Sequence, residues 1–332
     1  MTTGLWVTAS ALPPAVLTDA IPPACRRRVD ASAPPTVRPD GAEVLVQGPE
    51  WPVDGATYFV PSFAALTARS FSVRFELSVR LGGAWSPFAA GVGLGAPAFA
   101  PPSPIDGLDV DIDVFRTSTP ADAARLRLRL RADEAPALLE ARWMLGLSAS
   151  DGAPSPSPPP PATGSALRLE VPPRSQMDAD RAIAGRICSP TCVAMVLDYW
   201  RRPPALPTLA AEMFHAGVDL YGVWPAAIVA AGRRGLAGYL LRFPDWAAAT
   251  WCLERGLPIV ASVRYAAGEL TGAAVAATPG HLVVLTGWAG EDVLVNDPGA
   301  PSTASVARRY RLDEFARAWL GRASLGYVIF PV

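Results

Sequence analysis

Hydrophobic and polar residues alternate along much of the N-terminal half of the chain. The alternation is clearest in residues 71–79, 108–114 and 125–130. A period of two is typical of strands that bury one face, and turns rich in proline and glycine separate these stretches. We therefore predict that residues 1–147 form an all-β sandwich of the jelly-roll type, accessory to whatever follows it.

The polar positions of two of these stretches carry opposite charges. They are Asp109, Asp111 and Asp113 in one stretch, and Arg125, Arg127 and Arg129 in the other. Opposite charges on neighbouring strands stabilise sheets, so we predict a charge ladder between the two sets. The alternative reading of the three aspartates is a calcium site.

The character of the sequence changes after residue 147. Residues 148–166 read SASDGAPSPSPPPPATGSA, a composition typical of an extended linker. Beyond it we predict helices at 190–200 and 224–234, a third that Asp245 caps, and a fourth at 312–320. Strands are predicted at 257–263, 282–288, 293–296 and 327–330. Residues 167–332 should therefore be an α+β domain that folds independently of the first.

Composition excludes several kinds of partner and chemistry. The net charge is −1 and no basic cluster is longer than residues 26–28, so we expect neither nucleic acid nor membrane as a partner. All 29 basic residues are arginine, which excludes lysine Schiff-base chemistry and a Walker A loop. The four cysteines have no metal-site spacing and fit a reducing compartment. We expect a cytoplasmic protein that needs no cofactor or metal.

Cys188 is the candidate nucleophile. It lies two residues before Pro190, which opens a predicted helix, and the N-terminus of a helix stabilises a thiolate. Cys192 lies one turn further along the helix among apolar residues. It fits the ordinary role of a buried cysteine better.

The chain has two histidines that could serve as the base for a thiol. His281 starts a predicted strand, whereas His215 lies late in a predicted helix, so His281 is the better candidate. The strand after it ends at Asp297, and a turn at residues 289–292 would place Asp297 and His281 at the same end of a hairpin. Asp297 is the expected orienting acid. Its neighbour Asn296 remains an alternative.

An oxyanion needs hydrogen-bond donors, and a side-chain amide can add to the backbone N–H of the nucleophile. The chain has two glutamines. Gln176 precedes Cys188 by twelve positions, whereas Gln47 belongs to the predicted sandwich. Gln176 is therefore the candidate donor.

Six segments of the C-terminal half carry these residues and their surroundings: RSQM, ICSPTCVAMVLDYW, YGVWP, GLPIVASVRY, TPGHLVVLTGW and VNDPGAP. Together they resemble bacterial proteins of cysteine peptidase family thirty-nine and its relatives, the bacteriocin-processing peptidase-like group of the papain clan. The resemblance implies a papain-like domain in which Cys188 is the nucleophile, His281 the base, Asp297 the orienting acid and Gln176 the oxyanion donor. Ser189 stands where that family commonly has glycine.

The function implied is a cysteine hydrolase, peptidase or amidase, that cleaves a peptide or amide bond through a thioester. An acyltransferase with the same Cys-His-Asp site is one alternative. The other is a non-catalytic module whose sandwich binds carbohydrate or protein through Trp51, Tyr58, Trp85 and Trp143.

Overall fold

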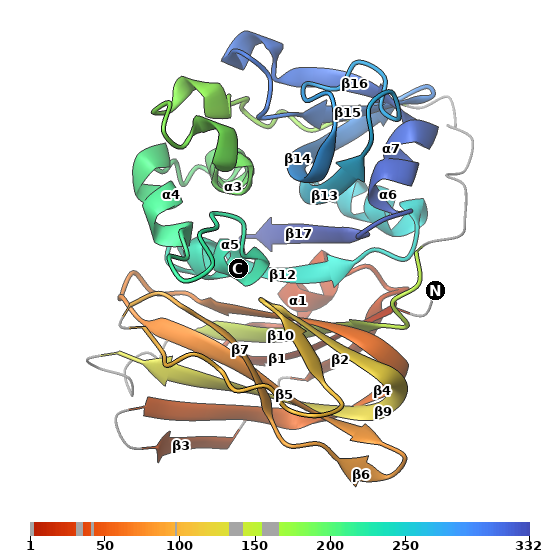
Figure 1. The fold of residues 1–332 in the computed structure, drawn as a ribbon. Helices are drawn as coiled ribbons and strands as arrows, with labels where there is room; N and C mark the ends of the chain where they lie inside the picture. Colours follow the sequence, from red (N-terminus) through yellow and green to blue (C-terminus); the bar gives the residue numbers. More distant parts are fainter. Residues whose placement is uncertain (1–2, 31–35, 41–42, 97, 133–141, 155–165) are drawn as a thin grey trace. The chain divides into compact units, whose positions relative to one another are not determined.

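The structure is a computed structural model that describes residues 3–30, 36–40, 43–96, 98–132, 142–154 and 166–332 (Figure 1). Its contacts divide the chain into two compact units. The first comprises Met1–Ala153, Val223–Leu240 and Val332, and the second comprises Pro154–Gly222 and Leu241–Pro331. Most of the predicted linker, residues 155–165, lies outside the described residues.

The first unit is rich in strands. Its elements are β1 (Thr3–Ser10), α1 (Pro14–Ala20), β2 (Arg26–Asp30), β3 (Thr36–Asp40), β4 (Glu43–Ala65), β5 (Ser72–Leu81), β6 (Ala84–Trp85), β7 (Ala89–Leu94), β8 (Asp109–Asp111), β9 (Val114–Arg131), β10 (Trp143–Ser150), α5 (Trp224–Gly232) and most of β12 (Ala237–Arg242). The strands β1 to β10 form one hydrogen-bonded sheet with the central order β2-β1-β10-β4-β9-β5-β6. The sandwich form stays a prediction, and helix α1 makes this unit strand-rich and not all-β.

Strand β4 is 23 residues long and bends, and this shapes the sheet. Its first part pairs with the end of β9, and its last eight residues pair with β10. Register shifts interrupt the pairing around Asp54 and Gly55, which both have positive φ. Such bulges let a long strand change direction, so one strand serves two parts of the sheet.

The apolar positions of the predicted alternation lie in the core of this unit, although Ser72, Glu76 and Ser78 between them are buried as well. The odd-numbered residues of 71–79 and the leucines at 126, 128 and 130 are all buried. Trp51 and Trp143, two of the aromatic residues considered for sugar stacking, are buried in the same core. Trp85 lies against the guanidinium of Arg125, and Tyr58 against that of Arg116. The two buried rings cannot stack on a sugar.

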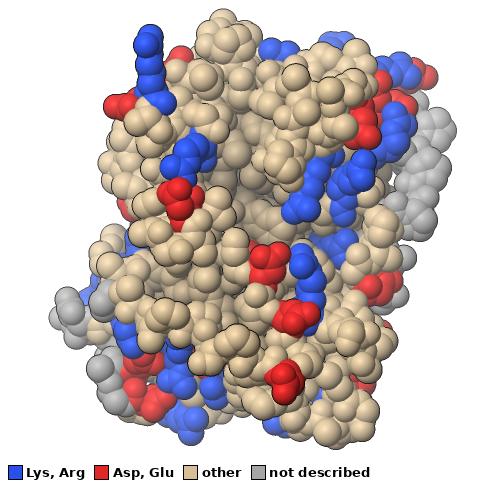
Figure 2. Space-filling view, viewed as in Figure 1, with Lys and Arg blue, Asp and Glu red and all other residues tan. Residues whose placement is uncertain are grey.

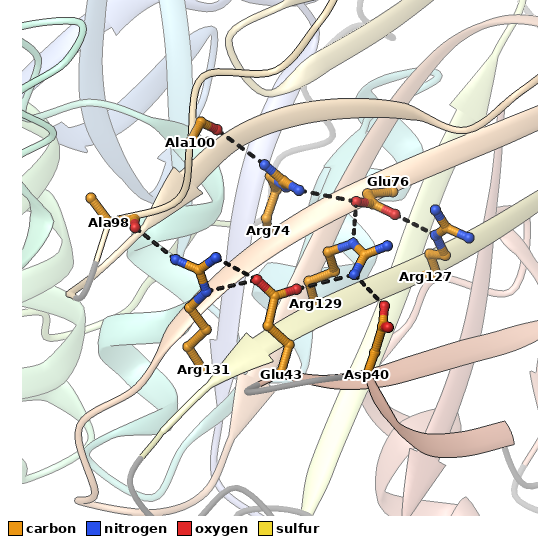
Figure 3. Close-up of polar contacts among 9 residues, drawn as sticks. All are labelled: Asp40, Glu43, Arg74, Glu76, Ala98, Ala100, Arg127, Arg129 and Arg131. Atoms are coloured by element: carbon orange, nitrogen blue, oxygen red, sulfur yellow. Dashed lines mark hydrogen bonds and ion pairs between the residues drawn. The ribbon is translucent and has the colours of Figure 1, made fainter.

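The predicted charge ladder is wrong in its partners. Strand β9 pairs with β5 and β4, so Glu76 of β5 lies opposite Arg127. Figure 3 shows Glu76 accepting hydrogen bonds from Arg127, from Arg129 at 2.6 Å and from Arg74 at 3.4 Å. Glu43 and Asp40 complete the network through Arg129 and Arg131.

The predicted aspartates lie elsewhere, because the short strand β8 pairs with the other end of β9. Asp111 makes a 3.5 Å ion pair with Arg116. Asp113 accepts a 2.6 Å hydrogen bond from the backbone N–H of Trp224, the first residue of α5. Burial raises the pKa of Asp113 to about 7 despite that bond.

Helix α5 belongs by its contacts to the first unit, although the sequence placed it in the second domain. Every residue from Pro225 to Gly232 is buried, as expected of a helix that is apolar on all sides. A side chain at Gly232 would come within 2.6 Å of the carbonyl oxygen of Ala65 in β4, so the two backbones approach closely. The division of the chain by contacts therefore differs from the predicted domain boundaries of 1–147 and 167–332. In addition, Ser148–Ser150, which were predicted to belong to the linker, pair with β1 as the end of β10.

The second unit mixes helices and strands, as predicted. Its elements are β11 (Leu167–Arg168), η1 (Gln176–Asp178), η2 (Ala184–Arg186), α3 (Cys188–Tyr199), α4 (Leu206–Met213), α6 (Trp246–Glu254), β13 (Ile259–Tyr265), β14 (Thr278–Ala289), β15 (Asp292–Asn296), η3 (Thr303–Ser305), β16 (Ala307–Arg311), α7 (Leu312–Trp319) and β17 (Leu325–Phe330). Its strands follow the order β17-β13-β14-β15-β16, and β11 pairs with β14. In Figure 1, α3 and α4 lie on one side of these strands and α6 and α7 on the other.

Local sequence signals account for several of these elements. Asp245 caps α6 by accepting a 2.8 Å hydrogen bond from the backbone N–H of Ala248. The hairpin of β14 and β15 closes with Ala289 opposite Asp292, as the turn residues predict. His215, by contrast, lies two residues after the end of α4 and not within a helix.

The described residues on the face of the molecule in Figure 2 form no large patch of a single charge. On the face drawn in Figure 2, basic and acidic side chains lie among one another on a largely uncharged surface. In the described part of the chain, no helix is long and apolar enough to cross a membrane.

Candidate active site

Cys188 is the first residue of α3. Ile187 occupies the N-cap position and offers no side-chain cap, so the first N–H groups of the helix are not satisfied in that way. The backbone groups of Ser189 and Leu282 stabilise the Cys188 thiolate and so lower the pKa of the thiol. Because α3 packs against β14, the helix N-terminus and the strand carrying His281 meet at this sulfur.

His281 lies on β14, and its imidazole is almost fully buried. Strand register explains why it meets Asp297. Val284 pairs with Asn296, so Asp297 faces Val283, and His281 is its diagonal neighbour on the same face. Nε2 of His281 lies 2.8 Å from Oδ1 of Asp297. The same ring interacts with the Cys188 thiol, and because Nε2 faces Asp297, Nδ1 is the nitrogen left to share a proton with that thiol.

Asp297 is fully buried and held by three partners. Besides His281, the backbone N–H of Gly299 donates to Oδ1 at 2.9 Å and the hydroxyl of Tyr310 donates to Oδ2 at 2.7 Å. A side chain at Gly299 would come within 3.2 Å of Oδ1 of Asp297 and 3.4 Å of the imidazole. A Cβ at position 299 would therefore crowd the carboxylate and the imidazole, and it would also come within 2.8 Å of a methyl group of Val275.

Asn296 points away from this cluster. Its amide nitrogen donates a 2.9 Å hydrogen bond to the carbonyl oxygen of Val171. Adjacent residues of a strand face opposite sides of the sheet, so Asn296 and Asp297 cannot both reach His281. Of the two alternatives left by the sequence, the structure places Asp297 on the imidazole.

Gln176 lies in η1, close to the end of β15 and to the segment before Cys188. Its backbone N–H donates to the carbonyl of Pro298 at 2.9 Å. Its amide nitrogen donates to the carbonyl of Ala184 at 2.8 Å, four residues before Cys188. Its amide oxygen is buried without a protein partner. Since an amide has two N–H groups, one of them remains for a further acceptor.

The pKa directions describe a charged pair. Burial raises the pKa of Cys188, but the hydrogen bond and positive charge of His281 outweigh it, so the net pKa is lowered. Burial likewise lowers the pKa of His281, but Asp297 and Cys188 together raise it to about 10. The pKa of Asp297 is lowered, because the contacts with His281 and Tyr310 outweigh its burial. These directions favour a thiolate beside an imidazolium.

The two rejected candidates lie in different surroundings. Cys192 is fully buried, and burial raises its pKa well above the ordinary value for a thiol. Its sulfur donates to the carbonyl oxygen of Leu282 at 3.2 Å. His215 accepts a 3.3 Å hydrogen bond at Nδ1 from the backbone N–H of Val218.

Sequence reasoning missed Tyr310, Gly299 and the backbone N–H of Leu282. Tyr310 is the one polar hydroxyl in the strand segment ARRYR, which offers no local sign that it reaches Asp297. The pairing of β15 with β16 brings it there, because Val293 lies opposite Tyr310 and shares a sheet face with Asp297. Only that register would have revealed the contact.

The arrangement can generate a sulfur nucleophile. A thiolate at a helix N-terminus, an imidazolium beside it and a buried carboxylate behind the imidazolium are the groups that nucleophilic acyl transfer requires. Every one of these side chains comes from the second unit.

The comparison with protein-family sequences finds a match in the same half of the chain as the candidate site. Residues 168–327 match the sequence model of the Peptidase_C39 like family. No curated protein matches the chain.

Two solved structures are similar to half of the chain. One is a double glycine motif protease from an AMS/PCAT transporter in complex with the leader peptide, at 20% identity, 50% coverage of this chain, 95% of that chain and a TM-score of 0.35. The other is a putative C39-like peptidase from Bacillus anthracis, at 20% identity, 51% and 98% coverage and a TM-score of 0.40. The family match over residues 168–327 shows that the C-terminal domain of this chain resembles C39-like peptidases.

Proposed function

We propose that this domain is a papain-like cysteine hydrolase, a peptidase or amidase, in which Cys188 attacks the carbonyl of a peptide or amide. The observation that carries the proposal is the position of His281, which lies 2.8 Å from Asp297 on one side and on the other acts on the Cys188 thiol, whose pKa it lowers. A buried imidazole between a thiol and a carboxylate is the arrangement that activates a cysteine for acyl transfer.

The proposed reaction has two halves. In the first, the Cys188 thiolate adds to the carbonyl, the imidazolium of His281 gives its proton to the leaving nitrogen, and a thioester and free amine result. In the second, neutral His281 takes a proton from water, the hydroxide adds to the thioester, and the carboxylic acid leaves as the thiolate is restored. Asp297 keeps Nε2 of His281 protonated in both halves, so Nδ1 carries the moving proton.

The negative oxygen of each tetrahedral intermediate needs donors. In the proposed mechanism the backbone N–H of Cys188 and the second N–H of Gln176 supply them. The position of Gln176 beside Ala184 and Pro298 supports this role, because both contacts fix η1 near the start of α3. Removal of one such donor typically lowers kcat about 100- to 1000-fold.

An active-site probe tests the proposal without knowledge of the natural substrate. The full chain would be treated with a peptide aldehyde, which forms a hemithioacetal with a catalytic thiolate, and with a library of quenched fluorescent peptides. We expect cleavage that Cys188→Ala abolishes and Cys192→Ala retains, because His281 lowers the pKa of Cys188 whereas burial raises that of Cys192. Cleavage that survives Cys188→Ala, or adduct formation at another cysteine, would contradict the proposal.

A further inference from the structure

Tyr310 occupies an unusual position for a strand tyrosine. Its side chain is 1% exposed, and its hydroxyl donates a 2.7 Å hydrogen bond to Oδ2 of Asp297. The same hydroxyl accepts a 3.3 Å hydrogen bond from the backbone N–H of Ala274. It is thus both donor and acceptor between the candidate catalytic acid and the loop of residues 266–277, the β13–β14 loop.

The β13–β14 loop is fixed by several neighbours in the second unit. Tyr265 donates to the carbonyl of Val275 at 3.1 Å, and Arg308 donates to that of Gly272 at 2.8 Å. Glu314 of α7 accepts hydrogen bonds from the backbone and hydroxyl of Thr271 at 2.7 and 3.0 Å. The N–H of Ala274 therefore has a defined position from which to orient the Tyr310 hydroxyl.

We propose that Tyr310 is a positioning residue of the candidate site, which holds Asp297 in the rotamer that bonds His281 and links it to the β13–β14 loop. Hydrogen bonds then run from Ala274 through Tyr310 and Asp297 to His281, which in turn acts on the Cys188 thiol. Consecutive hydrogen bonds polarise one another in a buried site, so the first members affect the thiolate at the end. This inference rests on the proposed function, whose nucleophile it serves.

The chemistry of the hydroxyl suits this role. Burial and the charge of Asp297 raise the pKa of Tyr310, so the phenol remains a donor throughout the working pH range. Its hydrogen bond helps to hold the pKa of Asp297 low. Loss of the bond would raise that pKa, and protonation of Asp297 would then remove the anion that stabilises the imidazolium.

Other ionisable groups near Asp297 must be considered in any pH profile. His281 of β14 and Tyr310 of β16 bond it directly, and Cys188 follows through His281. The charge of Asp297 also affects Cys192 of α3 and Tyr265 of β13, while Arg308 of β16 opposes its effect on both tyrosines. A thiol profile measured on Cys188 reports the combined titration of this group.

The test measures the rate of Cys188 alkylation by iodoacetamide against pH, in the full chain. For Tyr310→Phe we expect the acid midpoint of the rate profile to rise by up to about one to two pH units. A hydrogen bond to a charged group is worth that much in the pKa of Asp297, and protonation of Asp297 at acid pH removes the anion that stabilises the imidazolium beside Cys188. Replacement of Tyr310 by 3-fluorotyrosine, a stronger donor of the same shape, should move the midpoint downward. The matched control is Tyr239→Phe, which removes a buried hydroxyl that donates at 2.6 Å to the carbonyl of Ala20.

The results separate positioning from simple packing. A Tyr310→Phe protein that is folded and keeps the wild-type midpoint would overturn the inference, as would an equal shift in Tyr239→Phe. If Tyr310→Phe does not fold, the 3-fluorotyrosine protein decides, and an unchanged midpoint there would also overturn it. If Cys188 is alkylated with the same pH profile in His281→Ala as in the wild type, the inference and the proposed function would be overturned together.

Discussion

Replacement of His281 by alanine removes both the hydrogen bond and the positive charge that lower the pKa of the Cys188 thiol. Burial, which raises that pKa, remains. An opposite charge at contact distance usually shifts a pKa by about one to three units, so we take a rise of about two units in the variant. At a pH below the thiol pKa of both proteins, the thiolate fraction of Cys188 then falls about 100-fold.

A second effect opposes the first. A thiolate of higher pKa is a better nucleophile, with a Brønsted coefficient of about 0.4 to 0.5, so two units make it roughly eightfold more reactive. At a pH below both thiol pKa values the loss of thiolate outweighs its higher reactivity. The net rate of alkylation, tested at pH 6, should therefore fall about tenfold. Above the raised pKa of the variant thiol the order should reverse, and His281→Ala should react faster than the wild type.

The assay is iodoacetamide labelling of the full chain at a series of pH values, with peptide mapping to identify the cysteine. Cys25, Cys192 and Cys252 are buried, whereas Cys188 is partly exposed, so labelling should report one site. His215→Ala is the matched control because it removes the other histidine, and its profile should equal that of the wild type. Equal rates for His281→Ala and wild type at pH 6, or first labelling at Cys192, would refute the thiolate–imidazolium pair.

Four further outcomes follow from the same geometry. Hydrolysis should weaken as pH rises through about 10, because His281, with its pKa raised to about 10, then loses the proton that the leaving group needs, and a kcat/KM profile still rising there would contradict this assignment. Asp297→Asn should slow labelling at pH 6 about tenfold, whereas Asn296→Ala should cost about 1 kcal/mol in urea unfolding and leave the labelling profile unchanged, since it only frees the carbonyl of Val171. Glu76→Gln should lower the free energy of unfolding by about 3 kcal/mol, because it breaks a buried cluster of charges, while Asp111→Asn, whose carboxylate is 64% exposed, should change it by less than about 0.5 kcal/mol. A fragment of residues 168–332 should self-associate in size-exclusion chromatography, since α5 would lose its contacts with β4, and a folded monomeric fragment would show those contacts to be dispensable.

Local sequence predicted the elements that carry the candidate site. Proline near the first turn marks the start of α3, so Cys188 could be placed at a helix N-terminus without a structure. The turn between residues 289 and 292 fixes the β14–β15 hairpin, and with it the position of His281 and Asp297 at one end. Both inferences depend only on residues close together in the chain, where turn and helix signals are strong.

Pairing between distant strands was decided by the tertiary structure alone. Arg127, Arg129 and Arg131 at the end of β9 met Glu76, Glu43 and Asp40, and Arg125 met Glu50, because this part of the strand pairs with β5 and β4 and not with the strand of the predicted aspartates. Many carboxylates alternate with apolar residues in this half of the chain, and the pattern does not say which strand lies beside which. An arginine on a strand favours a carboxylate on the next strand, but only the order of the strands in the sheet decides which carboxylate that is.

The same limit applies within the second unit. Sequence left Asp297 and Asn296 as alternatives because they are adjacent, and a register shift of one residue would exchange their faces. It gave no sign of Tyr310, which needs the register of β16 on β15, nor of the membership of Val223–Leu240 in the first unit. The sequence by itself determined which groups were available for the chemistry and on which kind of element each one lies. Their contacts depended on the packing of elements far apart in the chain, since side chains meet across sheets and helices only after the whole fold has brought those elements together.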